Sequence, residues 1–210
     1  MDSNLVFSFD LSGQPPGDTH FACVCYDMDY CSDFFTNFKK QFKHSFHKKG
    51  KQLDEETLCK MLEFLDDHQI RSYCASYYKN NWDIVFRSIP EKKGYKIDKI
   101  CGIVYFILLN INTNPHYPYT IHVCKESFLD IDTVIGTCKD IAKMRGKNFN
   151  FAVGTDKQND YIKISDFVAS ATRKIKLEKL KSYRFYNHNK AHISNDYRVK
   201  AFNLYEKKKK

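Results

Sequence analysis

The sequence predicts an α/β protein with a mixed β-sheet, and two patterns lead to this fold class. Apolar runs at residues 5–13 and 20–28 flank a stretch rich in Gly and Pro, which indicates an antiparallel β-hairpin at the start of the chain. Farther along, segments with strand and helix patterns alternate, which is typical of parallel strands joined by helices. The sheet is therefore expected to combine antiparallel and parallel pairs.

The elements after the hairpin follow from spacing and capping signals. Five phenylalanines at helical intervals predict an amphipathic helix over residues 31–46. Asp54 precedes a second apolar stripe and is expected to cap a helix that ends near His68. Tyr and Cys content predicts a strand at residues 71–78, and residues 82–89 form a short strand or a loop before a proline. Residues 95–110 give the most apolar helix, which we expect to be central.

The remaining segments repeat the alternation. Residues 119–124 and 149–153 are predicted strands, residues 130–145 are a predicted helix, and Asp160 is expected to cap a helix that runs to Ile175. Periodicity fades near Lys181. The sequence thus predicts one domain over residues 1–180, followed by a basic, aromatic C-terminal extension over residues 181–210.

The composition fits a globular protein with a sizeable core. The chain has 210 residues, of which 42% are hydrophobic and 15% aromatic. Its eight cysteines contain no C-x-x-C pair and lie mostly in apolar segments, as reduced thiols in a core do, so we expect a cytoplasmic protein. The longest apolar stretch, residues 100–111, is too short to cross a bilayer, which argues against membrane insertion.

The positive charge is concentrated toward the C-terminus. The net charge of the chain is +9, and residues 171–210 hold thirteen Lys and Arg against three acidic residues. Aromatic residues alternate with these cations, a mixture that binds phosphates by charge and bases by stacking. A solvated helix with a solubilising lysine tail is the alternative. The candidate nucleic-acid-binding residues, including a second basic stretch before residue 52, are Lys48, Lys49, Lys51, Arg173, Lys174, Lys181 and Arg184.

Two aspartates stand out from their surroundings. Asp10 ends the first predicted strand, where an aspartate serves either as a metal ligand or as a turn former. Asp166 interrupts an apolar stretch of the last predicted helix. On the packed side of that helix its carboxylate would need a cation, a metal or hydrogen-bond donors, whereas on the other side it would face solvent or stabilise the helix N-terminus.

The two aspartates also carry a resemblance. Phe9-Asp10-Leu11-Ser12-Gly13 resembles the Asp-Glu-Ser-Gly signature of a family of ribonuclease H-like domains of unknown function (domain of unknown function family 3800). Residues 162–171 resemble its closing Leu-Gln-Leu-Ala-Asp-Phe-Val-Ala-Gly-Ala helix, and Thr155-Asp156-Lys157 resembles the Asp-Ser-Lys that precedes that helix. The resemblance implies a ribonuclease H-like mixed sheet with helices on both faces.

The resemblance further implies that Asp10 and Asp166 are catalytic. Together with Asp156 and Glu126 they would bind Mg²⁺ or Mn²⁺, hard cations that prefer oxygen ligands and that activate water for phosphodiester cleavage. The chain departs from the family pattern at Leu11, where the signature has Glu, and at Cys124, where a later strand of the family ends in Asp-Glu. Two functions therefore stay open: a metal-dependent nuclease, and a catalytically degenerate module that binds nucleic acid or a protein partner.

Overall fold

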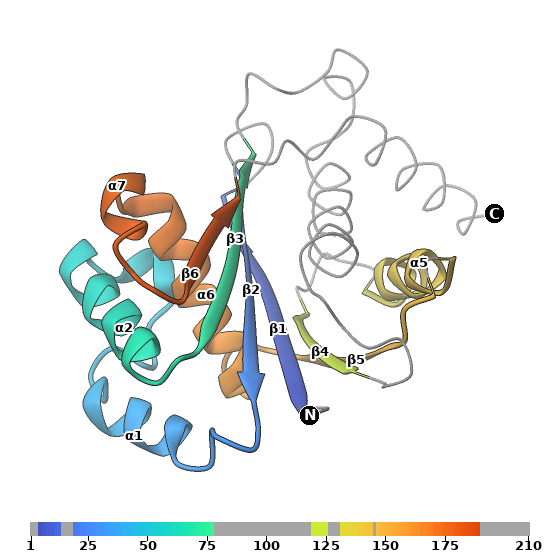
Figure 1. Ribbon diagram of the computed structural model, residues 1–210, viewed down its shortest axis with the longest axis horizontal. Helices are drawn as coiled ribbons and strands as arrows, with labels where there is room; N and C mark the ends of the chain where they lie inside the picture. Colours follow the sequence, from blue (N-terminus) through green and yellow to red (C-terminus); the bar gives the residue numbers. More distant parts are fainter. Residues whose placement is uncertain (1–3, 14–18, 78–118, 126–130, 145, 190–210) are drawn as a thin grey trace.

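A computed structural model describes residues 4–13, 19–77, 119–125, 131–144 and 146–189. The described residues form a six-stranded sheet with the order β5-β4-β1-β2-β3-β6 (Figure 1). The strands are β1 (Leu5–Ser12), β2 (Thr19–Asp27), β3 (Arg71–Tyr77), β4 (Tyr119–Cys124), β5 (Phe149–Gly154) and β6 (Tyr186–Asn189). The helices are α1 (Phe34–Gln41), η1 (Gly50–Gln52, a 3-10 turn), α2 (Glu55–Asp67), α5 (Ile131–Met144), α6 (Asp160–Lys174) and α7 (Leu177–Leu180).

The sheet is mixed, as the sequence predicts. β1 and β2 form the antiparallel hairpin, with Leu5 opposite Asp27 and Ser12 opposite His20. β3 continues antiparallel to β2, while β4 runs parallel to β1 and β5 runs parallel to β4. The carboxyl ends of β1, β4 and β5 therefore meet at one edge of the sheet.

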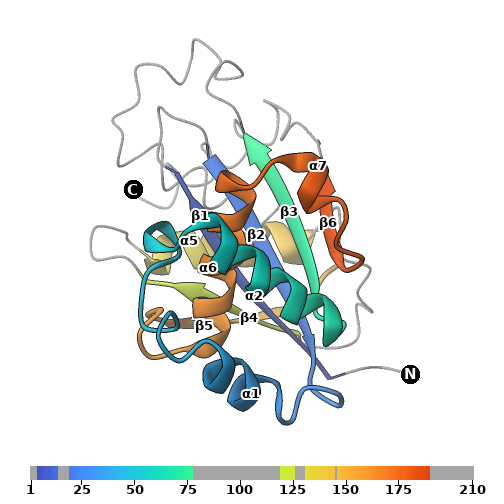
Figure 2. The ribbon, with the colours of Figure 1, turned by 90° about the vertical axis from the view of Figure 1, so that its left-hand side faces the viewer.

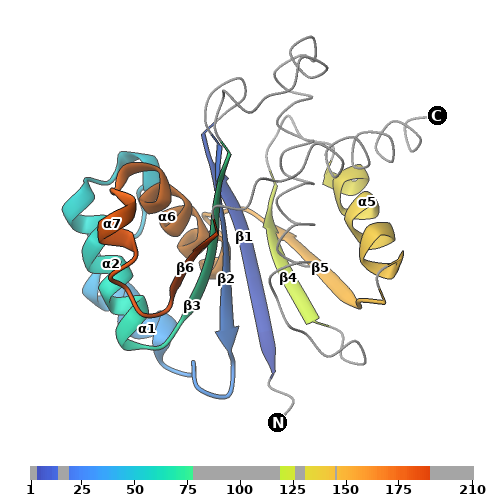
Figure 3. The same cartoon turned by 45° about the horizontal axis from the view of Figure 1, so that its top comes forward.

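Helices cover both faces of the sheet. Figures 1 and 3 show α1, α2, α6 and α7 on one side and α5 on the other. Figure 2 views the side that carries α1, α2, α6 and α7, where α6 lies against β1 and β2 and α2 packs on α6. The prediction of helices on both faces is confirmed, and α6 is the element that joins the helical layer to the centre of the sheet.

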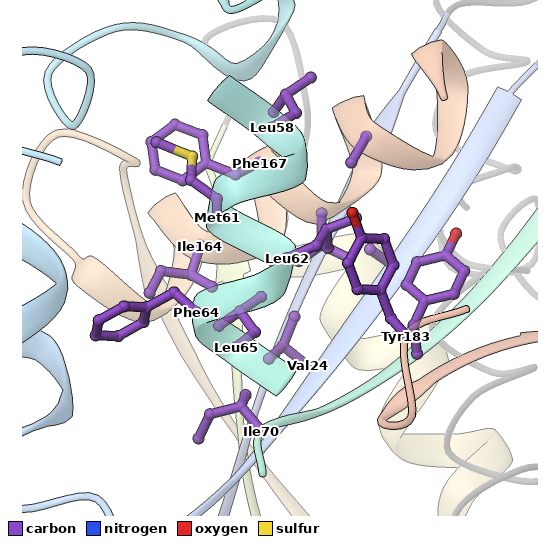
Figure 4. Packing of buried hydrophobic residues seen from close by; sticks show 14 of the residues in the cluster. Val24, Leu58, Met61, Leu62, Phe64, Leu65, Ile70, Ile164, Phe167 and Tyr183 are labelled. Carbon is purple, nitrogen blue, oxygen red and sulfur yellow. The ribbon is translucent and has the colours of Figure 1, made fainter. Parts of the chain in front are cut away.

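Apolar side chains of α2 and α6 fill the space above the sheet. Figure 4 shows the stripe of α2 beside Ile164 and Phe167 of α6, with Val24 of β2 beneath. Ile164 and Phe167 are both almost fully buried. Burial of each side chain of this size stabilises the fold by roughly 1.5–3 kcal/mol. The buried members of the stripe are Leu58, Met61, Leu62, Phe64 and Leu65.

The predicted start of α2 is confirmed. The Asp54 carboxylate accepts a hydrogen bond from the Thr57 N–H at 2.7 Å, so it satisfies one of the free donors of the first turn. Helix α1 is shorter than predicted, because the backbone leaves helical geometry at Phe42 (φ −105°, ψ 28°). The phenylalanine stripe nevertheless continues into the following turns, where the Phe42 ring lies 4.7 Å from that of Phe38.

The cap of α6 differs from the prediction. Asn159, not Asp160, is the capping residue, and its side-chain oxygen accepts hydrogen bonds from the N–H groups of Tyr161 (3.0 Å) and Ile162 (3.3 Å). Asn159 has the extended backbone that a cap requires, whereas Asp160 is already the first helical residue. The Asp160 carboxylate instead pairs with Lys39 at 2.5 Å and lies near the positive end of the helix.

Strand β6 was not predicted. Residues 186–189 pair in parallel with β3 and so belong to the sheet, although the sequence placed the domain boundary near Lys181. The Tyr186 hydroxyl lies 2.9 Å from Thr172 Oγ1 in α6, and the Asp66 carboxylate accepts the Phe185 N–H at 2.6 Å. These contacts fix the segment between α7 and β6 on the helical layer.

Several expectations fall outside the described residues, among them the segments 82–89 and 95–110 and most of the C-terminal extension. The seven cysteines that the structure describes are free thiols. Among the described helices, none combines the length and the apolar character needed to span a membrane.

Candidate functional site

Asp10 lies on the face of β1 that α6 covers. Ser8 lies two residues before Asp10 in the same strand, and its Oγ is 3.4 Å from the Tyr26 hydroxyl. This hydroxyl donates a hydrogen bond to the Tyr161 carbonyl of α6. Alternate residues of a strand share a face, so Asp10 points into the same layer. Its side chain is buried, and Oδ1 accepts the Leu11 N–H at 2.9 Å. The sheet thus places this carboxylate beneath α6.

Asp166 obtains its donor from the loop before α2. Its Oδ2 accepts a hydrogen bond from the Gly50 N–H of η1 at 2.8 Å. Burial raises the pKa of Asp166, and the charge of Asp156 acts in the same direction. The Gly50 hydrogen bond and the charges of Lys163 and Lys49 oppose this rise without cancelling it. The packed aspartate that the sequence singled out therefore accepts a hydrogen bond from a backbone donor, and the charges of two lysines favour its ionised form.

Asp156 is neutralised by lysines. It follows β5, its residue is 8% exposed, and its Oδ2 lies 2.6 Å from Lys49 Nζ and 3.5 Å from Lys163 Nζ. Burial alone would raise the pKa of Asp156. The hydrogen bond from Lys49 and the charges of both lysines outweigh burial and hold this pKa below its ordinary value. Asp156 is therefore an ionised carboxylate whose charge is balanced inside the protein.

The position of Gly50 explains how the loop reaches α6. A Cβ at this residue would lie 2.5 Å from Ser170 Oγ and 2.7 Å from the Asp166 carbonyl oxygen, closer than real side chains come. The backbone of η1 can therefore approach α6 closely enough to donate to Asp166 only with glycine at this position. This close approach also brings Lys49, the preceding residue, to the edge of the site.

The predicted nucleic-acid-binding residues fall into two groups. Lys49 pairs with Asp156, and Lys174 Nζ donates to the carbonyl oxygens of Lys51 (2.8 Å) and Leu53 (2.6 Å), so both ammonium groups have partners within the protein. The others have exposed side chains that can meet a phosphate backbone: Lys48, Lys51, Arg173, Lys181 and Arg184.

The described residues do not fit a divalent metal. Within residues 4–13, 19–77, 119–125, 131–144 and 146–189, no three His, Cys, Asp or Glu side chains are grouped closely enough to hold an ion. Mg²⁺ needs several oxygen ligands. Asp156 is already paired with two ammonium groups, and their positive charge would repel a metal ion. Glu126, the fourth predicted ligand, lies outside the described residues. Asp10, Asp156 and Asp166 as metal ligands therefore stay a prediction.

Sequence reasoning missed Lys163 and His122. Lys163 is 3% exposed. It lies three residues before Asp166 in an apolar stretch, and this helical spacing was the available signal that the two side chains share a face of the helix. His122 of β4 lies opposite Ser8 of β1 and stacks on Tyr161, with ring centroids 4.5 Å apart. Its Nδ1 is 2.8 Å from Asn159 Nδ2. An amide nitrogen only donates, so the neutral ring accepts at Nδ1 and carries its proton on Nε2.

His122 is expected to make stability depend on pH. Burial lowers its pKa below the ordinary value of 6.5. The unfolded chain therefore binds this proton more readily, and stability falls as pH drops from about 6.5 through the lower pKa of the folded state. Urea denaturation at intervals from pH 7.5 to 5 should show a steeper loss for the wild type than for His122→Gln. Equal slopes for the two proteins would contradict the prediction.

The strand order, the mixed pairing and the two helical layers define a ribonuclease H-like α/β fold. A solved structure of ribonuclease H2 from Pyrococcus horikoshii OT3 is similar, with a TM-score of 0.55, 16% sequence identity, and coverage of 98% of this chain and 89% of that chain. A structure of the PCNA:RNase HII complex from Archaeoglobus fulgidus matches with a TM-score of 0.49 at 15% identity, covering 85% of this chain and 75% of that one.

At this identity the likeness to ribonuclease H2 establishes the fold alone. No family model and no curated protein sequence matches the chain. The resemblance to domain of unknown function family 3800 therefore stays a prediction.

Proposed function

We propose that the chain is a ribonuclease H-like module that binds nucleic acid through its exposed lysines and arginines. In its acidic site, lysines of the same chain balance the charge of Asp156. The observation that carries this proposal is the pairing of Asp156 with Lys49 at 2.6 Å and with Lys163 at 3.5 Å. A carboxylate that already has two ammonium partners is a poor ligand for a divalent ion. Of the two functions that the sequence leaves open, the binding module without metal-dependent catalysis is therefore better supported than the metal-dependent nuclease.

The basic residues around η1 and the end of α6 support binding to a polyanion. Gly50 packs against α6 and Lys174 holds the same loop, so exposed Lys51 lies close to the last turn of α6, where Arg173 is also exposed. Lysine and arginine side chains that neutralise phosphates release counterions, and this release drives binding of any sequence. The surface thus fits a backbone-directed interaction with DNA or RNA.

Binding should weaken steeply with salt. Fluorescence anisotropy with labelled single- and double-stranded DNA and RNA, measured from 50 to 300 mM salt, is expected to give a linear fall of log K with log salt. In the Lys51→Gln/Arg173→Gln variant the slope should decrease by about 1–2, since each lost phosphate contact removes roughly 0.9. Lys60→Gln is the matched control, because Lys60 pairs with Glu56 on the surface of α2. Equal losses in the control and the variant, or salt-independent binding, would count against the proposal.

A divalent-metal-dependent nuclease is the second candidate. The observation in its favour is that Asp10 and Asp156 lie at the carboxyl ends of β1 and β5, two of three neighbouring parallel strands, where ligands of open α/β sheets bind. On this hypothesis Asp10 and Asp166 are catalytic, and with Asp156 and Glu126 they hold Mg²⁺ or Mn²⁺.

Cleavage assays separate the two candidates. The wild type and Asp10→Asn would be incubated with DNA and RNA in the presence of Mg²⁺, Mn²⁺ or EDTA. Cleavage that needs the metal and disappears in Asp10→Asn supports the nuclease. Equal, metal-independent behaviour of the two proteins removes it, and a protein partner is then the remaining expectation if nucleic acid does not bind.

A further inference from the structure

The segment over residues 34–53 carries positive charge and contains no acidic residue. It comprises α1, the turns after it and η1, and it holds six lysines and two histidines. Lys39 pairs with Asp160 and Lys49 pairs with Asp156, so these two ammonium groups have partners within the protein. Among the residues that the structure describes, no ion pair involves the other four lysines of the segment, which are Lys40, Lys43, Lys48 and Lys51.

Three phenylalanines fix which side of this segment faces outward. The N–H groups of Phe42 and Phe46 donate to the carbonyl oxygens four residues earlier at 2.9 and 2.8 Å, so helix-like hydrogen bonds continue past the end of α1. The rings of Phe42 and Phe46 lie 4.7 and 6.0 Å from that of Phe38, and Phe46 also packs on Phe167 of α6. The opposite side of this helical path has exposed positions at the spacing i, i+3, i+4, i+7 and i+8. These residues, here called the α1 face, are Lys40, Lys43, His44, His47 and Lys48.

The acidic groups next to the α1 face already have partners. Helices α2 and α6 pack on the segment through the rings of Phe64 and Phe167. The charge of Lys48 acts on Asp54 before α2, but the Asp54 carboxylate also accepts the Thr57 N–H as the helix cap. The other acids beside the segment belong to the ion pairs of Lys39 with Asp160 and of Lys49 with Asp156. The α1 face therefore keeps an excess of positive charge toward solvent.

Two histidines make the charge of the α1 face depend on pH. Histidine is the side chain whose charge ordinarily changes between about pH 5 and 8. His44 and His47 are exposed among the lysines, and each adds one positive charge when its ring is protonated. A phosphate near such a ring favours the protonated form, because opposite charges attract. The α1 face thus gains charge, and with it affinity for a polyanion, as the pH falls.

We infer that the α1 face contacts the phosphate backbone of nucleic acid, and that protonation of His44 and His47 strengthens this contact at acidic pH. The inference rests on the proposed function and adds a second contact surface together with its regulation. The five positions extend over more than two helical turns, too far for a single phosphate group, so the α1 face fits a chain of phosphates. Lys51 follows three residues after Lys48, which places the α1 face close to the proposed surface at Lys51 and Arg173.

Salt titrations at two pH values test this regulation. The probe is a labelled thymidine strand, alone and paired with its adenosine complement, because neither form titrates between pH 5.5 and 8. For the full chain, the fall of log K with log salt should be steeper at pH 5.5 than at pH 8 by about 1–2, since each added phosphate contact contributes roughly 0.7–0.9. His44→Gln/His47→Gln should show the wild-type slope at pH 8 and the same slope at pH 5.5. Circular dichroism at both pH values establishes that each protein is folded.

Two further variants make the test specific. His68→Gln removes another exposed histidine, at the end of α2, and should keep the wild-type change of slope with pH. Lys40→Gln/Lys43→Gln should lower the slope by about 1–2 at both pH values, because two phosphate contacts are lost.

Three results would each overturn the inference. They are an equal wild-type slope at pH 8 and pH 5.5, a wild-type pH dependence in His44→Gln/His47→Gln, and wild-type binding by Lys40→Gln/Lys43→Gln. If one of them occurs while Lys51→Gln/Arg173→Gln still lowers the slope, the proposed function stands and the role of the α1 face falls. Absent or salt-independent binding at both pH values would remove the proposed function as well.

Discussion

The variant Asp156→Asn is expected to lose about 3 kcal/mol of unfolding free energy. Lys163 is almost fully buried, and its ammonium group lies 3.5 Å from the Asp156 carboxylate. Removal of one partner of a buried ion pair leaves the other charge without compensation, which costs roughly 3–5 kcal/mol. We take the lower end of this range because the charge of Asp166 and the Phe167 ring also act on the Lys163 ammonium group. Urea denaturation at pH 7 measures the loss.

The matched control for this prediction is Asp160→Asn at the start of the same helix. Asp160 pairs with Lys39, but the two side chains are 34% and 47% exposed, and surface pairs of this kind contribute about 0–1 kcal/mol. Similar losses for both variants would show that Lys163 does not depend on Asp156. The double variant Asp156→Asn/Lys163→Met should recover much of the loss, because it removes the uncompensated charge as well.

The second large effect is expected for Gly50→Ala, with a loss of about 2–4 kcal/mol. The new methyl group would lie 2.5 Å from Ser170 Oγ and 2.7 Å from the Asp166 carbonyl oxygen, so η1 must move away from α6. Overpacking of this kind costs roughly 1–3 kcal/mol, and the movement also weakens the charge-assisted hydrogen bond to the Asp166 carboxylate. Thermal and urea unfolding of the variant would both show the loss.

Gly154→Ala provides the control for the added methyl group. At Gly154 the nearest atom to a new Cβ is 3.4 Å away, an ordinary contact, so stability should change by less than about 1 kcal/mol. In a Ser170→Gly background the additional loss caused by Gly50→Ala should shrink, because the Ser170 side chain is gone. An unchanged additional loss would place the strain elsewhere.

Much of the fold could be predicted from the sequence because its signals are local. The hairpin is encoded by two apolar runs around a Gly- and Pro-rich turn, and the start of α2 is encoded by Asp54. The cap of α6 was placed one residue late, because both Asn159 and Asp160 are residue types that cap helices. Strand β6 was not predicted, because its four residues pair with β3, more than a hundred positions earlier in the chain, and short strands carry little periodicity.

The candidate site was predictable only in part. Asp10 and Asp166 stood out because each is an acid in an apolar context, and the structure places Asp10 beneath α6 and Asp166 on α6 itself. The partners of the acids were not predictable, since Lys49 reaches Asp156 across more than a hundred residues of sequence. A basic stretch looks the same whether its lysines face solvent or a buried carboxylate. Only the tertiary structure shows that the ammonium groups of Lys49 and Lys174 have partners within the protein.

The position of β6 at the border of the sheet bears on how shortened versions of the chain would behave. β3 is bounded by β2 on one side and by β6 on the other, so removal of residues 186–189 would leave a row of unsatisfied amide and carbonyl groups along β3. An exposed edge strand can pair with a strand of another molecule. A fragment that stops at the end of α7 would therefore be prone to self-association, and residue 189 is the earliest sensible end for a truncated protein.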